Sequence, residues 1–256
     1  MLSLFTLLAV LPSCGDEPRS DEKGDGGPNG GDTGTETGSE LPADNTPVSP
    51  LTQLVNKTYV LKIDKTAWTK PSGTAGEELG GFTPTFAFTI SAVDEVAMTF
   101  TGLLGIAKDD GTQDTCNKTY PITGTLDNAT GSTTFTITTQ PADIQAIIVG
   151  PDPYPTAKAT LRHFTLTGQF QDQGAKYKYG TLESELDGRE IFNLFVLMDP
   201  VPANPDQLCS NLYSLGTPCE ACTFEPATTY CLGVKAEAIK VQTSPTLTIV
   251  AADFCQ

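Results

Sequence analysis

The sequence predicts an all-β protein in which an antiparallel meander of about nine to ten strands closes into a β-barrel or a barrel-like sandwich. Apolar and polar residues alternate along most of the chain after residue 50, as they do in half-buried strands. The alternating runs are rich in β-branched residues and are separated by short breaks of Gly, Pro, Asn or Asp. No helical pattern recurs between them, which argues against a parallel α/β architecture.

The first predicted strand is Thr58–Asp64, and Thr83–Ala92 with Val96–Ile106 is predicted to form a hairpin that turns at Asp94 and Glu95. Pro141–Val149 is the one stretch before residue 200 that we expect to be helical, and Asp206–Leu212 is expected to form one or two helical turns. The remaining predicted strands are Tyr120–Asp127, Ser132–Thr138, Ala159–Phe170, Tyr177–Leu186, Glu190–Met198, Tyr230–Val241 and Thr246–Val250.

Short gaps join Ala159–Phe170, Tyr177–Leu186 and Glu190–Met198, so these runs are expected to form a three-stranded meander. Neighbouring hairpins can hide their edges by closing into a barrel, whereas a Greek-key sandwich needs longer crossing connections. The barrel is therefore favoured, and the sandwich is the alternative.

The first residues are predicted to be an export signal. Leu2–Leu11 is apolar, but it is shorter than the roughly 20 residues of a membrane-spanning helix and matches the apolar core of a signal peptide. Leu11-Pro12-Ser13-Cys14 resembles the lipobox of bacterial lipoproteins. The resemblance implies a signal peptide over residues 1–13 and lipid attachment, such as palmitate, at Cys14. An ordinary secretory signal with an incidental Cys14 is the alternative.

Residues 14–50 are predicted to be a tether. Nine acidic and two basic side chains lie between residues 15 and 50, among many Gly and Pro residues and almost no large apolar ones. Such a segment cannot bury enough apolar surface to fold. Residues 51–256 are then predicted to form a single β domain.

The Gly- and Asp-rich tether and the segment Cys219–Leu232 resemble parts of envelope lipoproteins of Gram-negative bacteria. This resemblance implies a place in the cell envelope, at the outer membrane, facing the periplasm or the exterior. The net charge of −16 and the absence of a basic cluster argue against nucleic acid as a partner. The expected partners are a membrane, through the lipid anchor, and a small molecule, a glycan or another protein.

Seven cysteines are present, and lipidation of Cys14 would leave an even number for disulfides in an oxidising compartment. The spacing Cys219-x-x-Cys222 also suits zinc or a redox dithiol, but zinc ribbons usually have two such pairs. We expect one long-range disulfide, Cys116–Cys255, and two local disulfides in the loop region. The six cysteines predicted to pair are Cys116, Cys209, Cys219, Cys222, Cys231 and Cys255.

No catalytic residue, metal site or cofactor is predicted. His163 is the single histidine, no nucleophile elbow or metal-binding helix motif accompanies it, and it is expected at the surface or rim. Acidic residues do cluster on one predicted strand and its turn, and two carboxylates across a cleft would suffice for glycoside hydrolysis. Those residues are Glu183, Glu185, Asp187 and Glu190.

Two aromatic residues, Trp68 and Tyr154, are candidate ligand contacts, because they lie in loops near predicted strand ends and could stack on a sugar or an apolar ligand. Packing over the core is the alternative for both. The sequence thus favours a non-catalytic binding domain on an envelope lipoprotein, with a carboxylate-dependent hydrolase as the alternative function.

Overall fold

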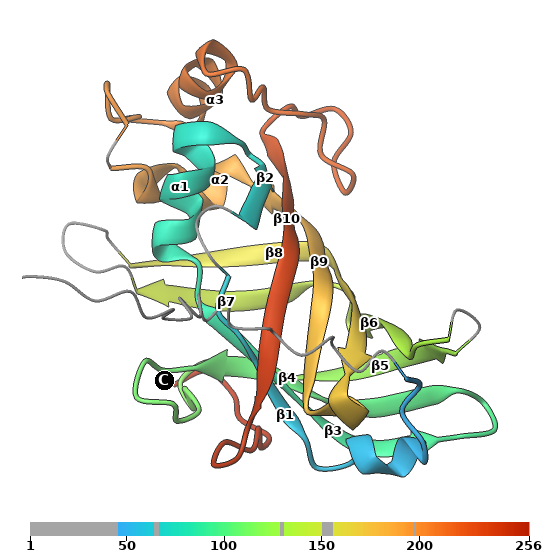
Figure 1. Ribbon diagram of the computed structural model, residues 1–256. Coiled ribbons are helices and arrows are strands. Elements are labelled where there is room, and N and C mark those ends of the chain that lie inside the picture. The colour runs from blue at the N-terminus through green and yellow to red at the C-terminus, as the bar shows by residue number, and fades with distance from the viewer. Residues whose placement is uncertain (1–45, 64–66, 129–130, 150–155, 197, 256) are drawn as a thin grey trace, which may run out of the picture. The chain divides into compact units, whose positions relative to one another are not determined.

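Eight antiparallel strands close into a barrel (Figure 1). The computed structural model describes residues 46–63, 67–128, 131–149, 156–196 and 198–255. The barrel strands are β1 (Thr58–Leu61), β3 (Thr85–Asp94), β4 (Thr99–Ala107), β5 (Tyr120–Asp127), β6 (Thr134–Thr139), β8 (Thr156–Gln171), β9 (Lys176–Asp187) and β10 (Cys231–Ser244). Each pairs with the next, and β1 pairs with β10 to complete the ring. The predicted all-β antiparallel fold is confirmed, and its strands close into a barrel rather than forming the alternative sandwich.

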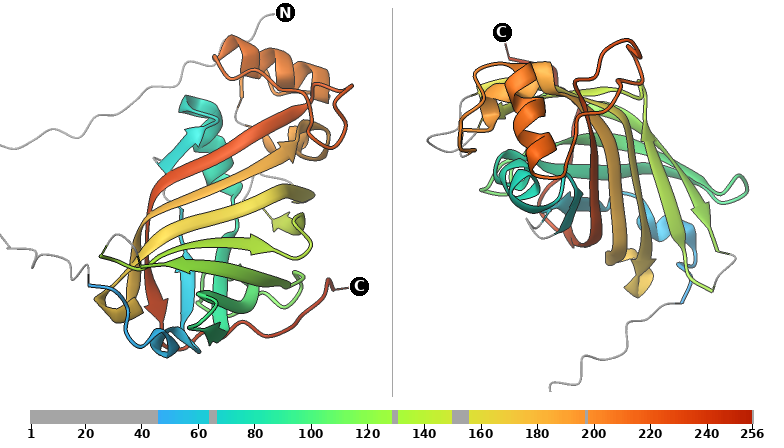
Figure 2. Two further views of the ribbon diagram at one scale, coloured as in Figure 1. Left: turned by 90° about the vertical axis from the view of Figure 1, so that its right-hand side faces the viewer. Right: turned by 90° about the horizontal axis from the view of Figure 1, so that it is seen from above.

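Two further strands and several short helices are attached to the barrel. β2 (Trp68–Lys70) pairs with β10, and β7 (Ile144–Val149) pairs with β8. The helices are η1 (Leu51–Leu54), α1 (Gly73–Phe82), η3 (Asp172–Gly174), α2 (Gly188–Ile191), η4 (Phe192–Leu194) and α3 (Pro205–Ser214). α1, α2 and α3 gather at one end of the barrel, and η1 lies at the other (Figure 2). None of the helices in the described ranges has the length and apolar content that crossing a membrane requires.

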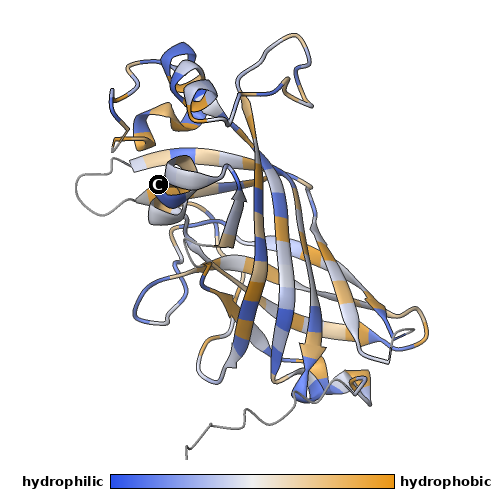
Figure 3. Ribbon diagram, turned by 45° about the horizontal axis from the view of Figure 1, so that its top comes forward, coloured by the Kyte–Doolittle hydropathy of each residue, from blue (hydrophilic) through white to orange (hydrophobic). Residues whose placement is uncertain are grey.

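The strands form because their side chains alternate between the core and the solvent. Buried and exposed positions alternate strictly along β5, where Tyr120, Ile122 and Leu126 point inward. The same alternation of hydrophobic and hydrophilic residues is visible along the barrel strands in Figure 3.

Aromatic rings fill the barrel near η1. The ring centroids of Tyr59 and Phe88 are 4.9 Å apart, and those of Phe135 and Phe170 are 4.6 Å apart. Phe135 lies over Gly168, its partner on β8, where a Cβ atom would come within 2.7 Å of the ring. An eight-stranded barrel is just wide enough to be filled by side chains or to hold one small ligand. At this end the side chains fill it.

Three disulfides are present, and their pairing agrees with the sequence prediction. Cys116 is joined to Cys255, Cys209 to Cys219 and Cys222 to Cys231. Cys219 and Cys222 therefore belong to two different disulfides, so they form neither a redox dithiol nor a zinc pair.

Pro141–Val149 and Glu190–Met198 were assigned the wrong element type. The first contains strand β7, because Ile144, Ala146 and Ile148 are buried with a period of two. Glu190–Met198 forms α2 and η4 instead of a strand, and β10 takes its expected place beside β9. Its buried residues, Ile191, Leu194, Phe195 and Met198, are spaced as on one face of a helix.

The sequence prediction also missed α1 and placed a strand at Thr246–Val250. That segment is not part of a backbone ladder, and the Ile249 N–H donates instead to Thr89 Oγ1 (2.9 Å). The packed chain begins before Leu51, since Val48 is buried and its N–H donates to Thr133 Oγ1 (2.8 Å).

Candidate functional site

The wall of the barrel has a seam beside β7. β6 and β7 both pair with the long strand β8, but only β6 pairs with β5 on its other side. The outer edge of β7 faces two side chains instead of a strand. The Tyr120 hydroxyl accepts from the Gln145 N–H (2.8 Å) and donates to the carbonyl of Gln145 (3.2 Å). Asn117 Oδ1 accepts from the Ile147 N–H (2.7 Å), and Asn117 Nδ2 lies 3.4 Å from the Ile147 carbonyl.

Asn117 is held firmly in this position. It is 3% exposed, and its Nδ2 also donates to Asp114 Oδ2 (2.8 Å). The disulfide Cys116–Cys255 ties the adjacent backbone to the C-terminal segment. The sequence offered no signal for this role, because Asn117 and Tyr120 act on a strand about thirty positions further along the chain.

A cleft of about 500 Å³ opens at the seam. Its walls come from the link between α1 and β3, the end of β4 with the following loop, and β7. The lining residues are Gly81, Phe82, Thr83, Pro84, Thr85, Ile106, Ala107, Lys108, Asp109, Asp114, Ile147 and Ile148. Ligand sites in proteins are typically clefts of roughly 300–1,000 Å³ with apolar walls and a few polar groups. This cleft has the size of one, and polar groups make up more of its accessible lining than apolar groups do.

A smaller cavity of about 20 Å³ lies beneath α1, inside the mouth of the barrel. Trp68, Leu79 and the barrel residues Leu161, Leu182 and Val234 line it. Four further residues line both spaces and separate them: Phe82, Thr83, Pro84 and Ile148.

Two buried polar groups on the elements that cover this mouth make no hydrogen bond within the described part of the chain. They are the carboxyl of Glu78 on α1, which is 3% exposed, and Nε1 of Trp68 on β2, which is 7% exposed. Burial raises the pKa of Glu78 to about 7. Such groups normally have partners, because leaving one unpaired costs about 1–3 kcal/mol.

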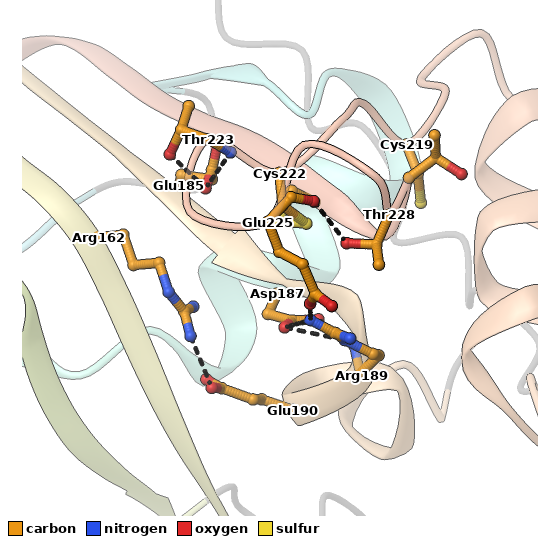
Figure 4. Close-up of a disulfide and its surroundings, with 12 residues drawn as sticks. Arg162, Glu185, Asp187, Arg189, Glu190, Cys219, Cys222, Thr223, Glu225 and Thr228 are labelled. Atoms are coloured by element: carbon orange, nitrogen blue, oxygen red, sulfur yellow. Dashed lines mark hydrogen bonds and ion pairs between the residues drawn. A yellow bond between two sulfur atoms is a disulfide. The ribbon is translucent and has the colours of Figure 1, made fainter.

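The acidic residues of β9 and α2 form a different cluster, in which cations pair with three of the four carboxylates. Figure 4 shows two of these pairs, Asp187 with Arg189 and Glu190 with Arg162. Arg189 Nη2 lies 2.7 Å from Asp187 Oδ2, and Arg162 Nη2 lies 3.1 Å from Glu190 Oε1. Glu183 pairs with Lys235. Burial opposes ionisation of Asp187, but the hydrogen bonds and charge of Arg189 outweigh it and hold the pKa below its ordinary value.

His163 lies beside this cluster and is exposed, as expected from the sequence. Its Nε2 is 3.0 Å from Thr223 Oγ1, and that hydroxyl donates to Glu185 Oε1 (3.0 Å). Because the hydroxyl proton is directed at the carboxylate, Nε2 must carry a proton and donate to the hydroxyl oxygen. His163 in this arrangement does not act as a base toward Thr223, and the contact fastens the cysteine-rich loop to the barrel.

Trp68, a predicted ligand contact, packs at the mouth of the barrel, so its ring contributes to the core and also lines the small cavity. Tyr154 and Cys14, the predicted site of lipid attachment, lie outside the described residues, as do the predicted signal peptide and most of the predicted tether. Within the described ranges, no group of three or more His, Cys, Asp or Glu residues is arranged to hold a metal ion.

Comparison with known proteins gives no relative for this fold or this site. No protein-family model, curated protein or solved structure matches the chain.

Proposed function

We propose that this chain is an exported lipoprotein, attached through acyl chains on Cys14 to the outer membrane, whose barrel binds a small ligand without catalysing a reaction. The cleft at the seam carries the binding part of this proposal, because it has the volume of a ligand site and a lining of both polar and apolar groups.

The three disulfides support the exported location. Disulfides form and persist in oxidising compartments and are rare in the cytosol. The apolar segment Leu2–Leu11 and the lipobox-like residues that end at Cys14 are consistent with a signal for export.

The arrangement of carboxylates favours binding over hydrolysis. A glycosidase needs a general acid with a raised pKa and a second carboxylate across the same cleft. Glu183, Asp187 and Glu190 each pair with a cation. Glu78 has the raised pKa, and it lies on α1, outside the lining of the cleft.

Native mass spectrometry of the full chain, purified in detergent from its own host, tests ligand binding. The expected result is a co-purifying small molecule that is lost from Asp109→Trp, which places a bulky ring on the exposed rim of the cleft. Val96→Trp is the matched control, because Val96 is 97% exposed at the far end of the β3–β4 hairpin. Absence of any adduct, or equal occupancy in Asp109→Trp, would contradict the proposal.

Growth of the host with radiolabelled palmitate tests the anchor. The label should appear on the full chain and be absent from Cys14→Ser. Equal labelling of both chains, or labelling of neither, would mean that Cys14 is not acylated.

A further inference from the structure

A second cleft opens where one edge of β10 has no strand partner. β2 pairs with β10 as far as Ala236, and β1 pairs with it from Thr243 onward (Figure 1). Between these positions no described strand covers that edge, because β1 ends at Leu61 and β2 begins at Trp68. The gap forms part of a cleft of about 460 Å³.

A β-bulge in β10 shapes this cleft. The register between β9 and β10 shifts between Ala236 and Ile239, and Ala238 inside the shift has a left-handed backbone with φ of 56°. Bulges re-aim side chains and are common beside binding sites. Ala238 is exposed and lines the cleft, where its methyl group takes up little of the space.

Two lysines, Lys62 and Lys240, line the cleft, and both are exposed. Neither ammonium group makes an ion pair or a hydrogen bond within the described part of the chain. Glu237 also lines the cleft, but its carboxylate is paired with Lys235 (Oε1 to Nζ, 2.8 Å). Two ammonium groups without partners therefore share one cleft, where they repel each other unless an anion lies between them.

We propose that this cleft binds a phosphate monoester, whose phosphate group lies between Lys62 and Lys240. Such a group carries a charge of about −1.5 to −2 at pH 7, so it matches two ammonium groups better than a singly charged anion does. The cleft of about 460 Å³ is larger than a phosphate group and leaves room for the organic part of the ester. Both lysines line the cleft as it stands, so binding requires no rearrangement of the fold.

The net charge of −16 does not prevent an anion from binding here. Charges more than about 8 Å away are largely screened at physiological ionic strength. The charges nearest the phosphate decide the affinity, and these are the two lysines and the ion pair between Glu237 and Lys235. The cleft shares no lining residue with the cleft at the seam, so this inference is independent of the proposed function.

Isothermal titration calorimetry of the full chain at pH 7.5 tests the site with phenyl phosphate and benzenesulfonate. These probes share one ring and differ in charge. We expect phenyl phosphate to bind with a Kd about tenfold or more below that of benzenesulfonate, because it can pair with both ammonium groups. Equal Kd values for the two probes, or no binding of phenyl phosphate, would overturn the proposal.

Lys240→Gln and Lys62→Gln should each raise the Kd for phenyl phosphate about tenfold, because each removes one charge-assisted hydrogen bond. Both side chains are exposed, so the variants should fold. Lys118→Gln is the matched control, since it removes one exposed lysine outside this cleft, and its Kd should be unchanged. An unchanged Kd in Lys240→Gln and Lys62→Gln, or an equal rise in Lys118→Gln, would also overturn the proposal.

Vesicles distinguish a soluble ester from a lipid, because phosphatidic acid carries the same phosphate monoester. Co-sedimentation is measured with the full chain carrying Cys14→Ser, which removes the proposed site of acylation. Vesicles of phosphatidylcholine with and without phosphatidic acid are compared. Binding that requires phosphatidic acid and is displaced by phenyl phosphate would identify a lipid ligand. Binding of phenyl phosphate without binding to these vesicles would identify a soluble one.

Discussion

Glu78 should make the stability of the folded protein depend on pH. Its pKa is about 7 in the folded chain, against an ordinary value of 4.5. Between these values the folded chain holds a proton that the unfolded chain has released, so stability falls as pH rises from 4.5 to about 7 and levels off above that range. The penalty at pH 8 is about 3 kcal/mol, because a tenfold change in proton affinity corresponds to about 1.4 kcal/mol.

Glu78→Gln isolates this effect, since other groups titrate equally in both proteins. The variant should match the unaltered chain to within about 1 kcal/mol at pH 4.5 and exceed it by about 3 kcal/mol at pH 8. For a domain of this size the gain corresponds to roughly 10 °C in Tm. Urea denaturation at pH 4.5, 6 and 8, without reductant, measures the difference.

The exposed neighbour provides the control, and Glu77→Gln should change stability by less than about 0.5 kcal/mol at every pH. The inference that the Glu78 carboxyl is buried and unpaired would be refuted if Glu78→Gln were as stable as the unaltered chain at pH 8. It would also be refuted if the difference in stability between the two proteins were independent of pH.

Three further predictions concern the seam, the long-range disulfide and the single histidine. Tyr120→Phe removes both hydrogen bonds to β7 and should cost about 1–3 kcal/mol, with faster amide hydrogen exchange in β7; unchanged exchange would contradict the role of this hydroxyl. Replacing both Cys116 and Cys255 with alanine removes the disulfide that joins two positions 139 residues apart. In the chain-entropy model this should cost about 5 kcal/mol in non-reducing thermal denaturation, and a loss below about 1 kcal/mol would count against it. His163→Ala should leave stability within about 1 kcal/mol, measured in urea, because its side chain makes one exposed hydrogen bond.

Period-two alternation identified most barrel strands, because a strand with one buried face alternates apolar and polar residues along its sequence. β5 and β9 were predicted within a few residues of their observed ends. The same rule failed where helical spacing was read as a strand, at Ile191–Met198, and where a glycine-rich segment became helical, at α1. In both places tertiary packing outweighed local propensity.

The candidate site was less accessible to prediction than the fold. Trp68 was identified as a residue near the mouth, but Glu78 was not, because an acidic residue in a glycine-rich stretch gives no sign of burial. Asn117 and Tyr120 were missed since their partners are backbone groups of β7, which no side-chain pattern reveals.

The sequence alone determined the all-β class, the oxidised cysteines and the strand alternation, because each depends on residue type and short-range spacing. Only the tertiary structure decided that the barrel closes between β1 and β10, that β7 leaves a seam and that a lone carboxyl is buried at the mouth. These features depend on which segments, distant in the sequence, come into contact. The closure of the barrel sets those contacts, and the local conformational preference of the residues does not.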